Sequence, residues 1–207
     1  KNILAQQSLI VSNAEKHKHK PEFVDDVINT VRNSVERMTR LMEQMKSGIR
    51  GSSSQQIDLG KLLQEITLAH ASDKPVPTLE TTTDTVYVLA DREQLATVFC
   101  HIVQNAQDAT ANDGRVTIRL KKRDDSAEVE IEDTGSGMDQ SFIQKRLFNP
   151  FDSTKGLTGM GIGVFESREY IRSLGGDIGV DSIPGQGSTF RITLSCAATT
   201  EKAPDEA

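Results

Sequence analysis

The chain has 207 residues with 36% hydrophobic and 26% charged side chains, which is enough for one large folded domain or two small ones. Its formal net charge of −6 excludes the basic surface that a general nucleic-acid binder needs. With two cysteines, Cys100 and Cys196, and no apolar run longer than the five residues from Val86 to Ala90, neither a disulfide-stapled secreted fold nor a spanning helix is expected.

The first 50 residues predict a helical hairpin. Residues 1–18 are compatible with a helix, and the stretch up to Pro21 ends it because proline cannot continue a helix interior. A hairpin of this kind exposes apolar surface when alone, so we expect two copies to pair into a four-helix bundle. Beyond the break, apolar side chains alternate at spacings of four and three residues, a heptad seam that packs against other helices: Val24, Ile28, Val31, Val35, Met38, Met42, Met45 and Ile49.

A Gly/Ser/Gln stretch at residues 51–56 predicts a linker, with a polar loop inside a single domain as the alternative. Residues 1–50, before the linker, carry a net charge of +3. Because the whole chain has a net charge of −6, the remaining residues carry −9. A basic helical face would attract an acidic protein partner, although a solvated face without a partner is the commoner meaning of a small imbalance.

Helical and strand patterns alternate after the linker, which predicts a helix-on-sheet domain over residues 57–196. Asp58 is expected to cap a helix, and two further helices are expected at residues 92–111 and 166–174. The tail, residues 197–207, is small and polar and is predicted to be disordered. Period-two or β-rich patterns predict strands at residues 86–90, 116–120, 128–132, 177–181 and 189–194.

Glycine is concentrated late in the chain, since 11 of the 15 glycines lie at or after Gly135. Such a concentration marks backbone that bends sharply or approaches a ligand closely. Gly159, Gly161 and Gly163 precede a predicted helix, whose free N–H groups and dipole favour a phosphate. A dinucleotide fingerprint is excluded because a Pro/Gly loop precedes these glycines in place of a strand, and Walker A is excluded because no Gly-Lys-Ser/Thr occurs.

Two further patches carry polar groups suited to a nucleotide. His101, Asn105 and Asp108 share one face of a predicted helix, where an amide oxygen beside a carboxylate suits Mg²⁺ and a solvated face is the equal alternative. Asp133-Thr-Gly135-Ser-Gly137 follows a predicted strand. Its carboxylate can accept a hydrogen bond from an exocyclic amine, and its glycines let backbone approach a flat ring.

The order of these patches resembles the catalytic domain of sensor histidine kinases, in the superfamily shared with gyrase, Hsp90 and MutL. An Asn-bearing helix is followed by Asp-x-Gly-x-Gly, then by Phe148-Asn-Pro-Phe151 and Gly-x-Gly-x-Gly, and the resemblance covers residues 57–196. It implies an α/β sandwich with a mixed sheet that binds ATP. The expected fold class is therefore α+β, with a helical hairpin ahead of this domain.

The resemblance also implies a role for each motif. Asn105 would hold Mg²⁺ that bridges the ATP phosphates, and Asp108 follows the superfamily pattern less closely. Asp133 would accept the adenine amine, assisted through water by Thr189, and the base would lie on Gly135 and Gly137. Residues 138–158 would form a lid in which Lys155 contacts the γ-phosphate. The stretch wrapping the phosphates would be Gly159, Met160, Gly161, Ile162 and Gly163.

Three function classes remain open. The first is phosphoryl transfer to a protein histidine, the second is ATP hydrolysis that drives a conformational switch, and the third is a scaffold with a dead nucleotide site. Hydrolysing relatives place Glu four residues before the metal-binding Asn and many sensor kinases place Asn there, whereas this chain has His101 and departs from both patterns. Without a carboxylate base, water activation should be poor. His101 could instead orient a proton or pack. The intact glycine motifs argue against the scaffold.

The hairpin resembles the dimerisation and phosphoacceptor region of sensor kinases, which implies a homodimer, an acceptor histidine and a response regulator that receives the phosphate on aspartate. No histidine of the chain fits an acceptor motif, but Lys1-Asn2 matches the end of His-Asp-Leu-Lys-Asn. We therefore expect a fragment whose acceptor lies just upstream, from the cytoplasmic part of a bacterial protein anchored to the membrane by regions outside this chain. The same start is similar to sensor kinases linked to exopolysaccharide and PEP-CTERM sorting systems.

Overall fold

A computed structural model describes residues 12, 20, 23–34, 54–81, 85–150 and 162–197 of the chain. The chain divides into two compact units, Lys1–Ser52 and Ser53–Ala207. In the first unit residues 23–34 are helical, and the seam residues Val24, Ile28 and Val31 are 41%, 48% and 41% exposed. The remainder of the hairpin lies outside the described residues, as does the predicted tail beyond residue 197, and both stay predictions.

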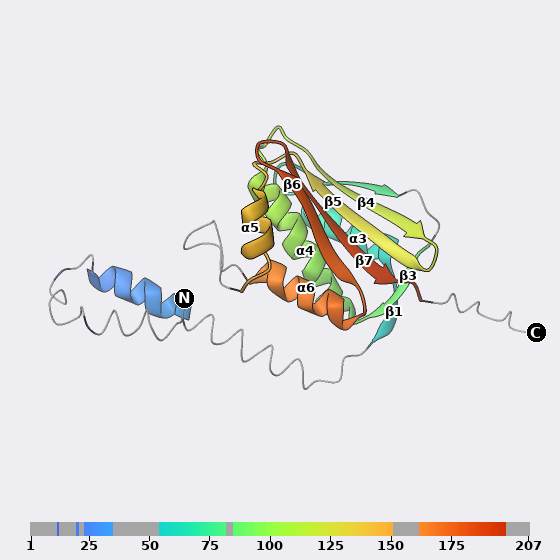
Figure 1. Ribbon diagram of the computed structural model, residues 1–207, viewed down its shortest axis with the longest axis horizontal. Coiled ribbons are helices and arrows are strands. Elements are labelled where there is room, and N and C mark those ends of the chain that lie inside the picture. Colours follow the sequence, from blue (N-terminus) through green and yellow to red (C-terminus); the bar gives the residue numbers. More distant parts are fainter. Residues whose placement is uncertain are drawn as a thin grey trace, which may run out of the picture. The chain divides into compact units, whose positions relative to one another are not determined.

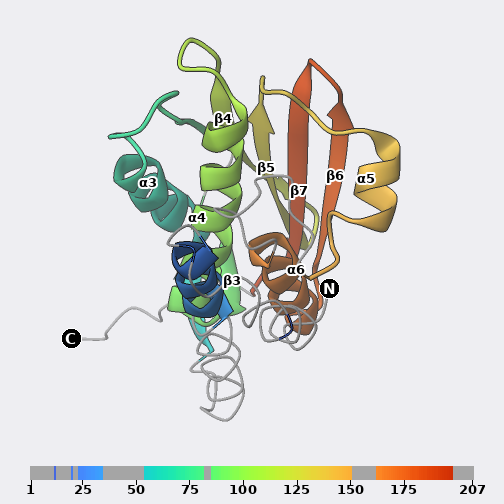
Figure 2. The same ribbon diagram turned by 90° about the vertical axis from the view of Figure 1, so that its left-hand side faces the viewer.

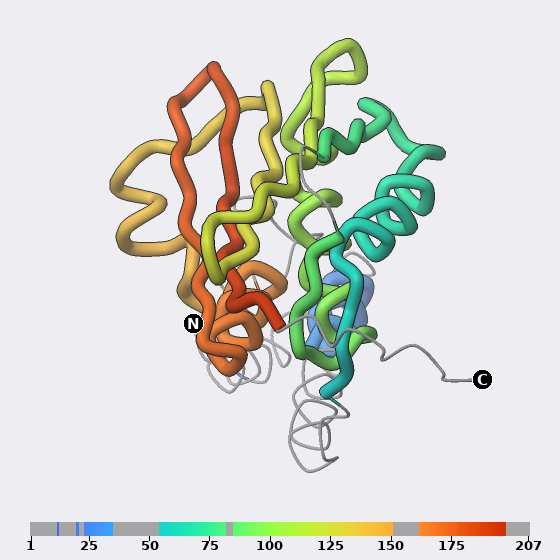
Figure 3. The backbone as a smooth tube through the Cα atoms, turned by 90° about the vertical axis from the view of Figure 1, so that its right-hand side faces the viewer, coloured from blue at the N-terminus to red at the C-terminus, as the bar shows by residue number. Residues whose placement is uncertain are grey.

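The second unit is a two-layer sandwich of helices on a mixed sheet, as the resemblance implied (Figure 1). Its five strands follow the order β2-β4-β5-β7-β6, and β2 pairs parallel to β4 while the other neighbours are antiparallel. In Figure 3 β6 and β7, in orange and red, run side by side at one edge. The strands are β2 (Thr78–Thr81), β4 (Val116–Arg123), β5 (Ser126–Asp133), β6 (Asp177–Ile183) and β7 (Gly187–Ser195).

Helices cover one face of this sheet, with α4 at the centre (Figure 2). A separate two-stranded sheet pairs β1 (Gln55–Asp58) with β3 (Tyr87–Ala90) in antiparallel fashion. The Asp58 side chain caps the first helix of this unit, as predicted, by accepting a 3.1 Å hydrogen bond from Lys61 N. The helices are α3 (Leu59–Ala69), α4 (Arg92–Ala109), α5 (Gln140–Lys145) and α6 (Gly163–Ser173).

The core lies between the sheet and the helices because side chains alternate along each strand. Every second residue of the central strands is apolar and turned to the helices, where burial of each contributes roughly 1.5–3 kcal/mol. Fully or almost fully buried members include Ile118, Leu120, Val129, Ile131, Phe190 and Ile192 of the sheet and Leu95, Phe99, Ile102 and Val103 of α4.

The opposite face of the sheet carries ion pairs between neighbouring strands. Lys121 Nζ lies 2.6 Å from Glu130 Oε2, and Arg191 Nε lies 3.2 Å from Glu130 Oε1. The hydrogen bond from Lys121 is the main cause that holds the pKa of the Glu130 carboxyl below its usual value. Arg119 pairs with Glu132 on the same face. The charges of this face are thus largely paired with one another, and the polar motifs of the sequence lie elsewhere.

Several element boundaries differ from the expectation. β1 begins at Gln55, inside the predicted linker, because residues 55–58 pair with residues 87–90. α6 begins at Gly163, three residues earlier than expected. The short elements β2 and α5 had no counterpart among the predicted elements.

Candidate nucleotide site

Tyr170 of α6 links that helix to the start of α4, and both helices lie beside the candidate site. The N-cap of α4, Asp91, accepts hydrogen bonds from the N–H groups of Glu93 and Gln94 at 3.0 and 3.1 Å. Tyr170 of α6 accepts from the backbone N of Asp91 at 3.0 Å and donates to its carbonyl at 3.2 Å. Burial raises the pKa of this phenol, so it stays a neutral donor. The start of α4 is therefore tied to α6.

The polar stripe predicted on α4 lies on the less buried side of that helix. His101 and Asn105 are half-buried and Asp108 is exposed, whereas Ile102, Val103 and the neighbouring apolar residues are inside the core. Gln104 Nε2 donates to Asp108 Oδ1 at 2.8 Å. The helix thus presents an amide and a carboxylate outside the core, where a ligand could reach both.

Asp133 ends β5 as a buried carboxyl that is only 4% exposed. Its Oδ1 accepts hydrogen bonds from Gly135 N at 2.8 Å and from Ser188 N at 3.3 Å. Burial raises the pKa of this carboxyl, and the hydrogen bonds from Gly135 and Ser188 oppose that rise. The result is an oriented acceptor in a site of low polarity, where a donor amine would be bound strongly.

The glycines after Asp133 are required by close approaches of the backbone. A Cβ on Gly135 would lie 2.4 Å from the carbonyl oxygen of Ala109, the last residue of α4. Gly137 has a φ of 64°, and a Cβ there would lie 2.1 Å from the carbonyl oxygen of Ile183. The contact at Gly135 brings the turn after Asp133 onto the end of α4, and the contact at Gly137 brings it onto the end of β6. The expected adenine acceptor therefore lies next to the end of the expected metal-binding helix.

The structure corrects the residue expected to assist Asp133. Strand register pairs Asp133 with Ser188, and it pairs Glu132 with Thr189. Since side chains alternate, Thr189 lies on the face of the sheet that carries the ion pairs. The neighbour of Asp133 is the buried Ser188, which the sequence reasoning missed because a register error of one residue changes the face.

The start of α6 lies against α4. A Cβ on Gly163 would be 3.3 Å from His101 Nδ1, and Ile162, the N-cap, makes no side-chain hydrogen bond to the helix. The N-cap side chain therefore leaves the first N–H groups of this 11-residue helix without a cap of its own, as suits an anion. Lys155, Gly159, Met160 and Gly161 lie outside the described residues.

Gln107 is a second residue that sequence reasoning missed. Although it lies on α4 between Asn105 and Asp108, its amide is buried and faces the loop after α3. Nε2 donates to the carbonyls of His70, Asp73 and Pro75 at 3.1, 3.2 and 3.1 Å. No sequence pattern indicates this contact, because only the folded loop brings the three carbonyls together.

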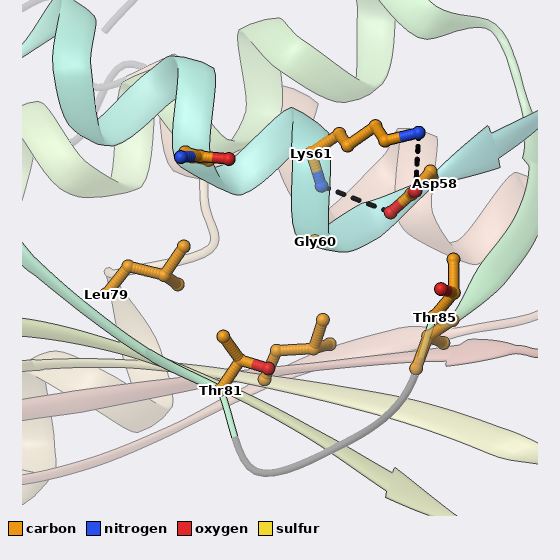
Figure 4. Close-up of a pocket in the computed structure, with 9 residues that line it drawn as sticks. Asp58, Gly60, Lys61, Leu79, Thr81 and Thr85 are labelled. Atoms are coloured by element: carbon orange, nitrogen blue, oxygen red, sulfur yellow. Dashed lines mark hydrogen bonds and ion pairs between the residues drawn. The ribbon is translucent and has the colours of Figure 1, made fainter.

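A cavity of about 480 Å³ lies away from these residues, between the start of α3 and strand β2 (Figure 4). Asp58 and Lys61 line one side, joined by an ion pair of 3.4 Å, and Thr81 and Thr85 line the other. None of its lining residues is one of the expected nucleotide contacts. The chemistry of the candidate site therefore depends on Asp133 and α4, and not on this cavity.

The turn after the buried Asp133 carboxyl packs on the end of α4, and α6 begins against His101 of the same helix. Residues 90–198 match the family of histidine kinase-, DNA gyrase B- and HSP90-like ATPases. The chain belongs to this family, whose members bind ATP, and the sequence resemblance is confirmed.

Similar proteins include histidine kinases. The signal transduction histidine-protein kinase AtoS of Escherichia coli is 32% identical over 176 residues, which is 82% of this chain and 29% of AtoS. The sensor protein FixL of Bradyrhizobium diazoefficiens is 38% identical over 158 residues, which is 72% of this chain and 30% of FixL. The histidine kinase ThkA, solved in complex with the response regulator protein TrrA, has the same fold with a TM-score of 0.62 at 20% identity, over 95% of this chain and 58% of that one.

The chain thus spans about three tenths of the length of these curated relatives, 29% of AtoS and 30% of FixL. Within the described part of the chain, no helix is both long and apolar enough to cross a bilayer.

Proposed function

We propose that the chain is the catalytic core of a sensor histidine kinase, which binds Mg·ATP and transfers its γ-phosphate to a protein histidine. The observation that carries this proposal is the buried Asp133 carboxyl, positioned by Ser188 N and Gly135 N at the end of α4. Family membership and the similarity to AtoS and FixL support it.

The adenine end of the site is built around Asp133. Its carboxylate would accept a hydrogen bond from the 6-amino group of adenine. A 6-oxo purine such as guanine carries an oxygen at that position. Ser188, whose hydroxyl also hydrogen-bonds Asp133, takes the assisting role that the sequence assigned to Thr189. The site should therefore select ATP over GTP, because the oxygen of guanine and the carboxylate are both acceptors.

The phosphate end combines α4 with the start of α6. Asn105, half-buried beside the exposed Asp108, offers an oxygen ligand of the kind that Mg²⁺ accepts alongside phosphates and water. The donor set therefore fits the metal, which when bound neutralises charge on the phosphates and orients them. Ile162 and Gly163 begin α6 against His101, where backbone N–H groups would receive the phosphate oxygens. Gly159, Met160, Gly161 and Lys155 are proposed to complete this end.

Transfer to histidine is favoured over an ATP-driven switch by His101. This residue stands where hydrolysing relatives carry the Glu that activates water, and it packs at Gly163. An attacking imidazole needs no such base, since catalysis of phosphoryl transfer is mainly positioning and charge neutralisation. The remaining steps of the proposal are a homodimer through the hairpin, a cytoplasmic location and relay to a response regulator, as in the ThkA–TrrA pair.

An extended chain that includes the residues upstream of Lys1 tests the proposal. Incubation with labelled ATP and Mg²⁺ should give acid-labile, base-stable phosphate, and Asn105→Ala should abolish it. Thr97→Ala, at an exposed position earlier on α4 whose hydroxyl donates to the Glu93 carbonyl, is the matched control and should label normally. Acid-stable label on Ser or Thr, or rapid ATP turnover without labelling, would contradict the histidine kinase assignment.

A further inference from the structure

Arg168, in the middle of α6, is held by a fork of hydrogen bonds to Asp177 at the start of β6. Its Nε lies 2.9 Å from Asp177 Oδ1, and its Nη2 lies 3.2 Å from Oδ2. A two-point contact of this kind fixes the plane of the guanidinium as well as its position. Arg168 is the main cause that keeps the pKa of the Asp177 carboxyl well below its usual value.

The same guanidinium lies over the ring of Phe148, with Cζ 4.0 Å from the ring centroid. A cation at this distance from an aromatic face is attracted by it. Arg172, one turn further along α6, also reaches Asp177, with Nε 3.0 Å from Oδ1. It is 49% exposed against 24% for Arg168, and it stacks on no ring in the part of the chain that the structure describes. The two arginines thus share a carboxylate and differ in the aromatic contact.

Phe148 belongs to a stretch that packs only in part against the core. The α5 helix before it, beside β6 in Figure 2, has no buried residue. Leu147 is buried at 9% exposure, and Phe142, Ile143 and Phe148 are only partly buried against the core. Phe148 is therefore held from two sides, by partial packing on the core and by the stacking on Arg168.

We propose that Arg168 is a positioning residue for the nucleotide site: held by Asp177, it fixes Phe148 against α6, the helix that begins at Gly163 beside His101. Gly163 and Arg168 are five residues apart on α6. His101 therefore contacts this helix at its start, and Phe148 contacts it about 8 Å further along the helix axis. Fixing Phe148 before ATP arrives reduces the ordering that binding must accomplish. This inference rests on the proposed function, because it assigns the pair a role in binding ATP.

A fluorescent reporter tests the anchor independently of the nucleotide. The chain has no tryptophan, so Phe148→Trp introduces a single one at the stacking position. Adding Arg168→Met should shift its emission to the red and increase its quenching by acrylamide, whereas adding Arg172→Met should change neither. Equal responses of the two variants would overturn the anchor, and so would the absence of any response to Arg168→Met.

Calorimetric titration with Mg·ATP then tests the positioning role. Arg168→Met and Phe148→Leu should each raise the dissociation constant about three- to tenfold, as expected for loss of one such contact. The double variant should be no weaker than the weaker single one, and Arg172→Met should bind as the wild type does. Thermal unfolding checks each variant. If Arg168→Met does not fold, Arg168→Gln, which removes the charge from the ring and the ion pair with Asp177, should show the same loss of affinity.

The outcomes separate this inference from the proposed function. Binding of Mg·ATP by the wild type with unchanged affinity in the Arg168 and Phe148 variants overturns the positioning role alone. Failure of the wild type to bind Mg·ATP overturns both.

Discussion

Ser188 donates its backbone N–H to Oδ1 of Asp133 across 3.3 Å, and its hydroxyl hydrogen-bonds the same carboxyl. The two residues lie opposite each other where β5 ends and β7 begins. Glu132 and Thr189, their direct neighbours, are also opposed, but they lie on the other face of the sheet. Ser188 therefore holds the buried carboxyl in place, and Thr189 does not.

Removal of the Ser188 hydroxyl should weaken ATP binding. Ser188→Ala keeps the backbone donor and loses the side-chain hydrogen bond, so we expect the dissociation constant for Mg·ATP to rise about three- to tenfold. Thr189→Ala is the matched control and should bind as the wild type does. The reverse order in a calorimetric titration would show that the register-based assignment is wrong.

ATP affinity should fall in mildly acidic solution. Burial raises the pKa of the Asp133 carboxyl, so protonation removes the carboxylate acceptor at a pH where an exposed Asp stays ionised. Dissociation constants measured between about pH 5 and pH 8 should show this loss in the wild type. Protonation of ATP itself affects the wild type and Asp133→Asn equally. The variant should therefore lack the additional loss of affinity that comes from protonation of Asp133. Parallel profiles would exclude Asp133 as the titrating group.

The raised pKa of the Asp133 carboxyl also predicts that Asp133→Asn does not destabilise the fold at neutral pH and can stabilise it. A carboxyl whose folded pKa is raised stabilises the fold fully below its unfolded pKa, and that contribution is lost as pH rises through the folded pKa. At neutral pH the buried charge is thus a cost, while Asn Oδ1 can still accept from Gly135 N and Ser188 N. Thermal unfolding at neutral pH should occur at the same or a higher temperature in the variant. A clearly lower temperature would count against this account.

Gly135→Ala should destabilise the second unit. The new Cβ would lie 2.4 Å from the carbonyl oxygen of Ala109, which is backbone and cannot move aside cheaply. We expect a loss of about 2 kcal/mol in the free energy of unfolding, measured by urea denaturation. Gly179→Ala, on β6, has no heavy atom within 4 Å of its Cβ and should change stability by about 0.5 kcal/mol or less. Equal effects at the two positions would contradict the close approach.

Gln107→Leu should also reduce stability, because three carbonyls of the loop after α3 lose their donor. A loss of about 2 kcal/mol is expected in urea denaturation. Gln104→Ala removes an exposed amide from the same helix and should stay within about 0.5 kcal/mol of the wild type. A small effect at Gln107 would mean that water satisfies these carbonyls when the amide is removed.

The longer elements could be predicted because their apolar periodicity is unambiguous. In α4 the buried residues recur at helical spacing, and Asp91 caps the helix. β2 could not be predicted, since none of the four residues of Thr78–Thr81 is fully buried and its position depends on pairing with β4. β1 was not predicted for a similar reason, because Gln55 and Gln56 have the composition of a linker and form a strand only by pairing with β3.

The placement of Asp133 could be predicted because its position after a strand follows from the strand pattern. The structure shows a buried carboxyl at the end of β5, and its role as the adenine acceptor stays a prediction. Ser188 and Gln107 were missed because their contacts depend on sheet register and on a folded loop. Neither the sheet register nor the conformation of that loop can be derived from the spacing of residues in the sequence.

Selectivity between two purine nucleotides tests the central claim most directly. Calorimetric titrations of the wild type and of Asp133→Asn with Mg·ATP and Mg·GTP should show that the wild type binds ATP at least about tenfold more tightly than GTP, a difference of roughly 1.4 kcal/mol. Asp133→Asn should lose most of that preference through weaker ATP binding. Equal binding of ATP and GTP by the wild type, or unchanged ATP affinity in Asp133→Asn, would contradict the account.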